Sequence, residues 1–283
     1  MFQQAYENRY RALGPTNRNT YFAFRNMGQM SLLLGHYDES ERIFTHCLDV
    51  TLKLQSRVNH YLNCLIWLVN LHLFFGKADE AYDFLQRAHK AAEDYPPKHK
   101  EKQSVRLSSC FYFYETRPKQ TKSSVSELED ALKQADEYRD AWVGASCQSC
   151  PSSIQRSFFA CPKCPKYVLR FCHACVARNM PAAFCAHDIR LAMFKPPARL
   201  LQETRLALLA QERDWPEYDK YYDAYEEFCT HEQVPDTERI VRKCQRVNGK
   251  RRRSVCSGSV TPDRNQSPRR QPPTDGTGYS FRH

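Results

Sequence analysis

The stretch CQSCPSSIQRSFFACPKCPKYVLRFCHACVARNMPAAFCAH, residues 147–187, is the most informative for the fold because its cysteines recur in close pairs. Three C-x-x-C pairs are followed by one C-x-H pair. A C-x-x-C turn directs both sulfur atoms at one metal ion, and four such pairs supply the ligands of two tetrahedral zinc ions. The spacing therefore predicts two structural zinc sites.

The order of the pairs suggests how they divide between the two ions. We expect them to interleave, first with third and second with fourth, although spacing alone leaves sequential pairing open. So short a segment buries little apolar surface, and metal binding would supply about 10–16 kcal/mol of folding free energy. The predicted ligands are Cys147, Cys150, Cys172 and Cys175 for one ion, and Cys161, Cys164, Cys185 and His187 for the other.

Disulfides and a redox-active C-x-x-C are the alternatives to metal binding. The first residues, MFQQAYENRYRALG, lack the apolar core of a secretory signal, so we expect an intracellular chain, cytoplasmic or nuclear, with reduced thiols. No βαβ pattern surrounds the pairs, as a redox motif would require. The other cysteines are scattered, unlike a disulfide framework, at positions 47, 64, 110, 229, 244 and 256.

The number of metal ligands and the charge of this segment indicate what it can catalyse or bind. A catalytic zinc keeps an open coordination position, and here each ion has four protein ligands, so we expect no enzymatic activity at the metal. His173, inside the third pair, is expected to face solvent or a neighbouring polar group. Asp188 is the one acid of residues 141–200, against basic residues at 156, 163, 166, 170, 178, 190, 195 and 199. This excess either offsets the thiolates or forms a basic contact surface.

The segment resembles a ZZ-type zinc finger. Ile154 and Phe159 precede the second pair at that family's spacing, and Pro165, Tyr167 and Leu169 follow it. The resemblance implies a cross-braced two-zinc module. Gln148 stands where the family has an acid, which argues against the family's positively charged peptide ligands. A MYND-like finger is the second candidate, with a different spacing of its closing pairs.

An internal repeat precedes the zinc segment. MGQMSLLLGHYDES, from Met27, and LVNLHLFFGKADEA, from Leu68, align with a displacement of 41 residues. In both copies a glycine ends one helix and a pair of acids opens the next, where the helix dipole favours negative charge. Small residues, Ser40 and Ala81, then allow close packing. The pattern predicts two helical hairpins, 22–34 with 38–54 and 60–75 with 78–94.

These hairpins resemble tetratricopeptide repeats of the kinesin-light-chain type. Residues 3–13 would be the second helix of a preceding repeat, and a third hairpin is expected at 104–115 and 124–139, with its turn at 117–119. The resemblance implies a concave groove lined by the first helix of each hairpin, where a partner peptide binds. By register, the candidate groove residues are Arg25, Gln29, Asn63 and Asn70.

The segment after the zinc module is predicted to contain three helices, at 198–213, 216–230 and 234–247. The chain has a net charge of +10, much of it in a tail whose basic runs and prolines indicate disorder. Its run at 250–253 suggests a nuclear import signal or a phosphate-binding patch, unless the tail serves solubility alone. No stretch is long and apolar enough to predict a membrane span or a membrane partner.

The predicted fold class is mainly α. It comprises a TPR-like solenoid of helical hairpins over 1–140, a zinc-binding module over 141–195, a helical extension over 196–247 and a disordered basic tail over 248–283. We expect a non-enzymatic adaptor that binds protein or peptide partners and carries two structural Zn²⁺ ions as its cofactor. The alternatives are a ubiquitin-ligase-type activity and nucleic-acid binding, the latter weakly supported because no aromatic residues alternate with the basic run.

Overall fold

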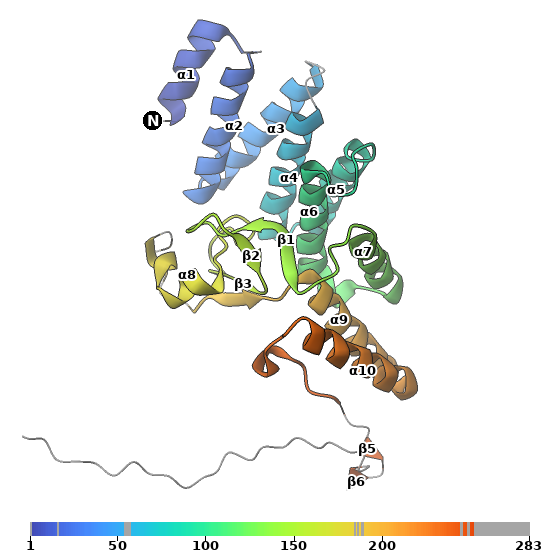
Figure 1. The fold of residues 1–283 in the computed structure, drawn as a ribbon. Coiled ribbons are helices and arrows are strands. Elements are labelled where there is room, and N and C mark those ends of the chain that lie inside the picture. The colour runs from blue at the N-terminus through green and yellow to red at the C-terminus, as the bar shows by residue number, and fades with distance from the viewer. Residues whose placement is uncertain are drawn as a thin grey trace, which may run out of the picture. The chain divides into compact units, whose positions relative to one another are not determined.

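The structure is a computed structural model that describes residues 2–15, 17–53, 58–183, 185, 187, 190–243, 246–247 and 250–251. These residues are mainly helical, with ten α-helices and three short two-stranded sheets (Figure 1). Met1–Arg242 forms one compact unit and Lys243–His283 a second. Among the described residues, no helix combines the length and apolar character that crossing a membrane requires.

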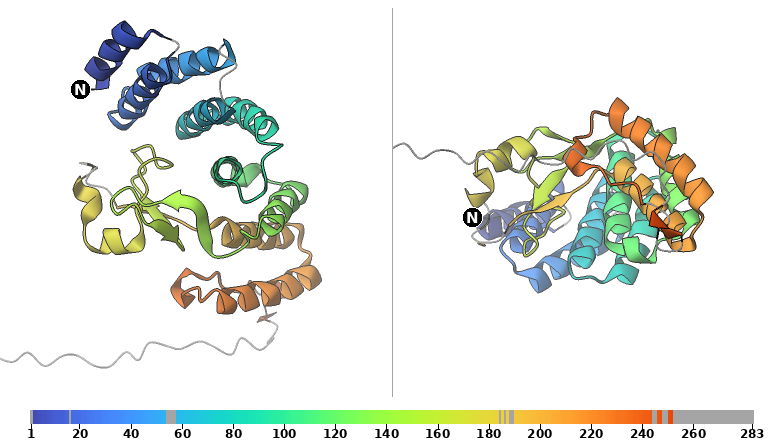
Figure 2. Two further views of the ribbon diagram at one scale, coloured as in Figure 1. Left: turned by 45° about the horizontal axis from the view of Figure 1, so that its top comes forward. Right: turned by 90° about the horizontal axis from the view of Figure 1, so that it is seen from below.

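The first unit opens with a run of helices joined by short turns. They are α1 (Phe2–Leu13), α2 (Arg18–Leu33), α3 (Tyr37–Lys53), α4 (Val58–Phe74) and α5 (Ala78–Ala91). Each helix packs against the next in the chain, because apolar residues at helical spacing give every helix a face to bury. Figure 2 shows the hairpins stacked in chain order. The two predicted hairpins are present, with ends that differ by a few residues.

Two glycines end the first helices of these hairpins, as predicted. Gly35 and Gly76 have φ angles of 82° and 70°, a conformation that glycine adopts without steric cost. Acidic residues then occupy the first turns of α3 and α5. The repeat therefore sets both where the first helix stops and where the second begins.

The close packing of α2 on α3 depends on a third glycine. The hydroxyl of Ser40 donates to the carbonyl oxygen of Gly28 at 2.9 Å. A Cβ atom on Gly28 would lie 2.7 Å from Cγ2 of Ile43, closer than van der Waals contact allows. Ala81, the counterpart of Ser40 in the second hairpin, is fully buried, so both copies use small residues at this crossing.

The third hairpin is also present. It consists of α6 (Lys100–Thr116), a 3-10 turn η1 (Arg117–Lys119) and α7 (Lys122–Gln134). Thr121 and Ser124 form a capping box at the start of α7, which satisfies backbone donors that the helix leaves unpaired. α6 packs against α4 and α5 on one side and against β1 (Ala141–Ser146) and α9 (Pro197–Glu212) on another. This helix therefore connects the hairpins to the cysteine-rich segment.

Short strands frame the cysteine-rich segment. β1 pairs antiparallel with β2 (Ser153–Gln155), and β3 (Phe158–Ala160) pairs antiparallel with β4 (Ala192–Phe194). An isolated bridge joins Phe159 to Phe171. α8 (His173–Ala177) and a 3-10 turn η2 (Met180–Ala183) lie between β3 and β4 in the chain. Because the segment contains so little regular structure, backbone hydrogen bonds alone cannot account for its stability, and side-chain interactions must contribute.

An aromatic cluster joins the cysteine-rich segment to α6. The ring of Phe111 stacks on Tyr167 with centroids 4.4 Å apart and lies 5.3 Å from the ring of Trp142. Phe158 and Phe194 stack at 4.7 Å, and the Trp142 indole donates to the carbonyl oxygen of Phe194 at 3.1 Å. All five side chains are buried in the main core. The hairpins and the cysteine-rich segment therefore share one hydrophobic core.

A second, smaller core forms after this segment, between α9 and α10 (Trp215–His231). α9 buries the leucines at 200, 201, 206 and 209, as its pattern predicts. The tyrosines of α10 contribute to the smaller core: Tyr218, Tyr222 and Tyr225 are buried. The two predicted helices here are confirmed.

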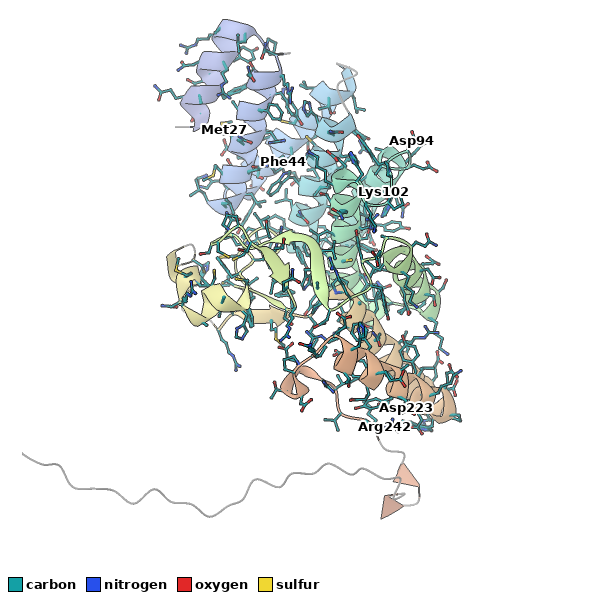
Figure 3. The ribbon with its side chains drawn as sticks, in the orientation of Figure 1. Met27, Phe44, Asp94, Lys102, Asp223 and Arg242 are labelled. Carbon is teal, nitrogen blue, oxygen red and sulfur yellow. The ribbon has the colours of Figure 1, made fainter. Side chains whose placement is uncertain are left out.

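The third helix predicted for 234–247 is wrong in the residues that the structure describes. A 3-10 turn, η3 (Asp236–Glu238), is followed by an extended segment along α10. Tyr222 donates to the carbonyl oxygen of Ile240 at 2.8 Å, and the Ile240 amide donates to the Tyr225 hydroxyl at 3.1 Å. Arg242 pairs with Asp223, both labelled in Figure 3. Backbone groups that a helix would use internally are bonded to α10 instead.

A fully buried arginine links four parts of the first unit. The guanidinium of Arg199 on α9 lies 3.0 Å from Asp140 Oδ1, 2.8 Å from Glu238 Oε2 and 2.8 Å from the Ser157 hydroxyl. These partners come from the segment before β1, the β2–β3 turn and η3. Because burying an unpaired charge is costly, this network favours the observed arrangement of the four segments.

The second unit contains one described element, a small hairpin of β5 (Arg246–Val247) and β6 (Lys250–Arg251). Most of the predicted disordered tail, 248–283, lies outside the described residues. The predicted domain boundaries stay predictions, since no observation here tests them.

Candidate metal centres

The first candidate centre is formed by Cys147, Cys150, Cys172 and Cys175. Cys147 directly follows β1, and Cys172 is the N-cap residue of α8. The sulfurs of Cys150 and Cys172 are 3.7 Å apart, and the Cys172 amide donates to the Cys147 sulfur at 3.4 Å. All four sulfurs lie within 4.8 Å of one another. This group could hold a metal ion.

The second candidate centre is formed by Cys161, Cys164, Cys185 and His187. Cys161 directly follows β3, and Cys164 lies in the turn after it. Nδ1 of His187 is 3.6 Å from the sulfur of Cys161, 3.4 Å from that of Cys164 and 3.2 Å from that of Cys185. The sulfurs of Cys164 and Cys185 are 3.4 Å apart. This group, too, could hold a metal ion, with His187 contributing Nδ1.

The structure brings together all eight predicted ligands in the interleaved order. The first pair meets the third and the second meets the fourth, as expected. Backbone bonds bring the crossing strands into register: the Phe159 and Phe171 amides donate to each other's carbonyl oxygens at 2.9 and 2.8 Å, and the Gln148 amide donates to Arg170 at 2.9 Å. These bonds place Cys172 beside the first turn, and Cys161 remains free to meet the closing pair.

The described cysteines form no disulfides. The sulfur separations of 3.7 and 3.4 Å exceed the bond length of about 2.05 Å in a disulfide. All cysteines of both centres are free, and so are the buried Cys47, Cys64, Cys110 and Cys229. Cys244 and Cys256 lie outside the described residues.

The protein environment alone does not ionise these thiols together. A hydrogen bond from Ser152 lowers the pKa of exposed Cys150 to about 6. Burial, with added repulsion from the Cys185 and Cys161 sulfurs, raises the pKa of Cys164 to about 12. A dication between the ligands would lower the pKa of every coordinating thiol, because a coordinating thiol is deprotonated. Metal binding at these centres would therefore release protons.

The basic side chains of the segment fall into two groups. Lys166 pairs with Glu115 of α6 at 2.7 Å, Lys195 pairs with Glu203 at 2.8 Å, and Arg199 is in the buried network. Arg170 donates to the carbonyl oxygens of Ser146 and Tyr167. The other four are exposed: Arg156, Lys163, Arg178 and Arg190. Four of the eight basic residues thus form ion pairs or hydrogen bonds within the first unit.

The predicted groove residues lie on the first helices of the hairpins. Arg25 and Gln29 are half-buried on α2, and Asn63 is half-buried on α4. Asn70 of α4 is 9% exposed, and its Oδ1 has no hydrogen-bond partner among the described residues. The structure shows no hydrogen bond joining any two of these four side chains in the described part of the chain.

A cavity of about 160 Å³ lies between α4 and α6, and Asn63 contributes to its wall. It is lined by Leu62, Asn63, Ile66, Lys100, Glu101 and Ser104. Only Asn63 was among the predicted groove residues, and the other five were missed by sequence reasoning. The repeat displacement could have found Ser104, because adding 41 to Asn63 gives that position; subtracting 41 gives Phe22 on α2.

No protein-family model, curated protein or solved structure matches this chain.

Proposed function

We propose that the chain is a non-enzymatic adaptor in which TPR-like hairpins bind a partner and a ZZ-like, cross-braced module with two structural zinc ions fixes the end of the hairpin stack. The observation that carries the proposal is the pair of four-ligand sets within the core that also contains the hairpins. A site with four protein ligands has no open position for substrate, which favours a structural role.

The chemistry and spacing of the ligands favour zinc. For Zn–S bonds of about 2.3 Å, tetrahedral geometry places sulfur atoms about 3.8 Å apart, and sulfur and nitrogen about 3.5 Å apart. The corresponding sulfur–sulfur separations are 3.7 Å in the first centre and 3.4 Å in the second, and the sulfur–nitrogen separations to His187 are 3.2–3.6 Å. Thiolate with imidazole is a ligand set that selects zinc over harder ions such as Mg²⁺ or Ca²⁺.

The hairpins supply the partner surface in this proposal. α4 and α6 are first helices of successive hairpins, and the cavity between them has polar and apolar walls suited to side chains of an extended peptide. α6 also carries Phe111 of the aromatic cluster. A partner bound against α6 therefore contacts the same helix that the zinc module packs against.

The engaged basic residues support this function over nucleic-acid binding. A phosphate-binding surface needs several free cations on one face, and four of the eight basic residues of 141–200 bind acids or carbonyl oxygens within the unit. The four exposed ones leave room for a weaker, nonspecific attraction to polyanions.

Site-specific photo-crosslinking in the full chain tests the adaptor function. A benzophenone side chain replaces Asn63, in the cavity wall, or Gln86, exposed on α5. Discrete crosslinked partners from Asn63 and few or none from Gln86 are expected. Equal capture at both positions would contradict the proposal that partners bind in the groove.

A ubiquitination assay tests the alternative function. If the purified protein forms ubiquitin chains with any of a panel of conjugating enzymes, the protein is a ubiquitin ligase and the proposal of a non-enzymatic adaptor is wrong.

A further inference from the structure

The chain after η3 lies against α10 as an extended segment of four residues, Arg239–Arg242, which we call the strap. Its first residue has φ and ψ angles of −78° and 148°, and no residue of the strap belongs to a helix or strand. Ile240 packs on the smaller core of α9 and α10, whereas Val241 is 86% exposed. Side chains that alternate between contact and solvent are typical of an extended peptide bound to a surface.

Two tyrosines of α10 bind the backbone of one strap residue. The Tyr222 hydroxyl donates to the carbonyl oxygen of Ile240 at 2.8 Å, and the Ile240 amide donates to the Tyr225 hydroxyl at 3.1 Å. Tyr225 in turn donates to Glu203 at 3.2 Å, which leaves its oxygen to accept the bond from the amide. Because both bonds go to backbone groups, they do not depend on the side chain of the residue that is bound.

The same face of α10 binds an arginine side chain two residues further along the strap. The Arg242 guanidinium lies 4.5 Å from the centroid of the Tyr222 ring. It pairs with Asp223, beside which it lies in Figure 3, and is 3.7 Å from Asp219. A planar guanidinium suits both an aromatic face and carboxylates, whereas an ammonium or a neutral side chain would satisfy only part of this site.

The two ends of the strap are held differently. Arg239 donates to the carbonyl oxygen of Val234 at 2.8 and 2.9 Å, within its own stretch of chain. The side chains of Asp219 and Asp223, which hold Arg242, are 60% and 67% exposed, and such exposed ion pairs contribute about 0–1 kcal/mol each. The end of the strap can therefore leave α10 while its start stays in place, because this local opening breaks only the weaker contacts.

We propose that this face of α10 is a binding surface for an extended partner segment with the sequence pattern aliphatic-x-Arg, and that Ile240–Arg242 occupies it as a competing segment of the same chain. The partner's aliphatic residue replaces Ile240 between the two tyrosine hydroxyls, and its arginine replaces Arg242. A tethered segment has an effective concentration in the millimolar range, so the strap lowers the apparent affinity of the partner. The surface belongs to α10 and not to the hairpins, so this proposal does not rest on the adaptor function.

The test is fluorescence anisotropy of the full chain with the labelled peptide GSRIVRSG, and with GSRIVQSG as the probe that lacks the second arginine. Ile240→Gly with Arg242→Ala releases the strap, and this variant should bind the first peptide about tenfold or more tightly than wild type does. Val241→Ala, at the exposed strap residue, is the control and should stay within about twofold of wild type. The released variant should prefer the first peptide over the second.

Charge-matched variants of α10, made in the released chain, separate this site from general attraction. Asp219→Asn with Asp223→Asn should weaken binding of the first peptide about fivefold or more. Glu217→Gln with Glu227→Gln removes the same charge from the same helix and should change binding about twofold or less. Thermal melts show whether each variant folds.

Equal binding of the first peptide by wild type and the released variant would overturn the inference, as would equal losses in the two acid variants. If the released variant does not fold, hydrogen exchange of the wild-type chain decides: excess GSRIVRSG should speed exchange of the Ile240 amide and leave the amides within α10 unchanged. An unchanged rate at Ile240 would overturn the inference. A wild-type dimer that the two strap substitutions abolish would also overturn it, because the occupant would then be the strap of a second copy.

Discussion

At the scale of single residues, Gly28 decides how closely the first hairpin can close. Alanine is the better helix former by about 1 kcal/mol, so an isolated helix would gain from Gly28→Ala. In the structure the added Cβ would lie 2.7 Å from Ile43 Cγ2. We predict a net loss of about 1–3 kcal/mol of unfolding free energy, since overpacking outweighs propensity.

Urea unfolding measures this loss, and the background Ile43→Ala supplies the control. Removing the clashing methyl group should reduce the cost of Gly28→Ala, giving non-additive changes for two residues in contact. A stabilised Gly28→Ala single variant would show that the two helices do not approach as described.

The ligand assignment makes a prediction for single cysteines. Cys172→Ser should remove the ion of the first centre, because three thiolates cannot complete the coordination shell. His173→Ala is the matched control in the same turn: His173 is exposed and contacts the ring of Phe159. Metal analysis should find about one ion per chain in the first variant and about two in the second. Two ions in Cys172→Ser would contradict the assignment, and loss in His173→Ala would make that histidine a ligand.

At the scale of elements, the aromatic cluster connects α6 to the cysteine-rich segment. Phe111 is 1% exposed and touches both Trp142 and Tyr167. Phe111→Ala should cost about 3–5 kcal/mol. Phe75→Ala, at a residue that is 44% exposed, should cost far less. Denaturant unfolding of both variants tests this, and similar losses would mean that the cluster adds nothing beyond ordinary burial.

Asp140 should give the buried Arg199 network a pH dependence. Burial raises the pKa of this carboxyl to about 6, although Arg199 opposes the rise. The folded state thus holds the proton more tightly than the unfolded state, whose pKa is about 3.9. The stability contributed by Asp140 is therefore present at low pH and is lost as pH rises through about 6, with a slope of at most about 1.4 kcal/mol per pH unit.

Urea unfolding of Asp140→Asn and wild type, at pH 5 and pH 7 with metal content checked, measures this effect. The variant should gain stability relative to wild type at the higher pH. Asp136→Asn, at an exposed carboxyl paired with Lys98, is the control and should show no such change. An Asp140 difference that is equal at both pH values would contradict the raised pKa.

The sequence predicts the secondary-structure elements better than the tertiary contacts between them. The C-x-x-C spacing and the repeat glycines specify local geometry, so the eight ligand residues and the hairpin turns follow from them, whereas the interleaved division of the ligands is fixed only by contacts such as those between Phe159 and Phe171. The contacts of Phe111 with Trp142 and Tyr167 join segments that are far apart in the chain, and no local sequence pattern predicts such contacts. The segment after Val234 was mispredicted as a helix because its bonds to Tyr222 and Tyr225 compete with helical ones.

At the scale of the whole molecule, metal and hairpins should be thermodynamically coupled. The cysteine-rich segment contributes Trp142, Phe158, Tyr167 and Phe194 to the core that contains α6. The segment has little regular structure, so metal binding would add much to its order. Removing metal should therefore lower the stability of the hairpins as well as of the module, a behaviour that two independently folding domains would not show.

The central claim is that two ions are held by the crossed ligand sets, and native mass spectrometry of the gently purified, unreduced chain tests it most directly. We predict two zinc ions per chain, with every cysteine of the two centres reduced once the metal is removed. Fewer than two ions per chain, or cysteines of the two centres joined to each other as disulfides, would contradict the account.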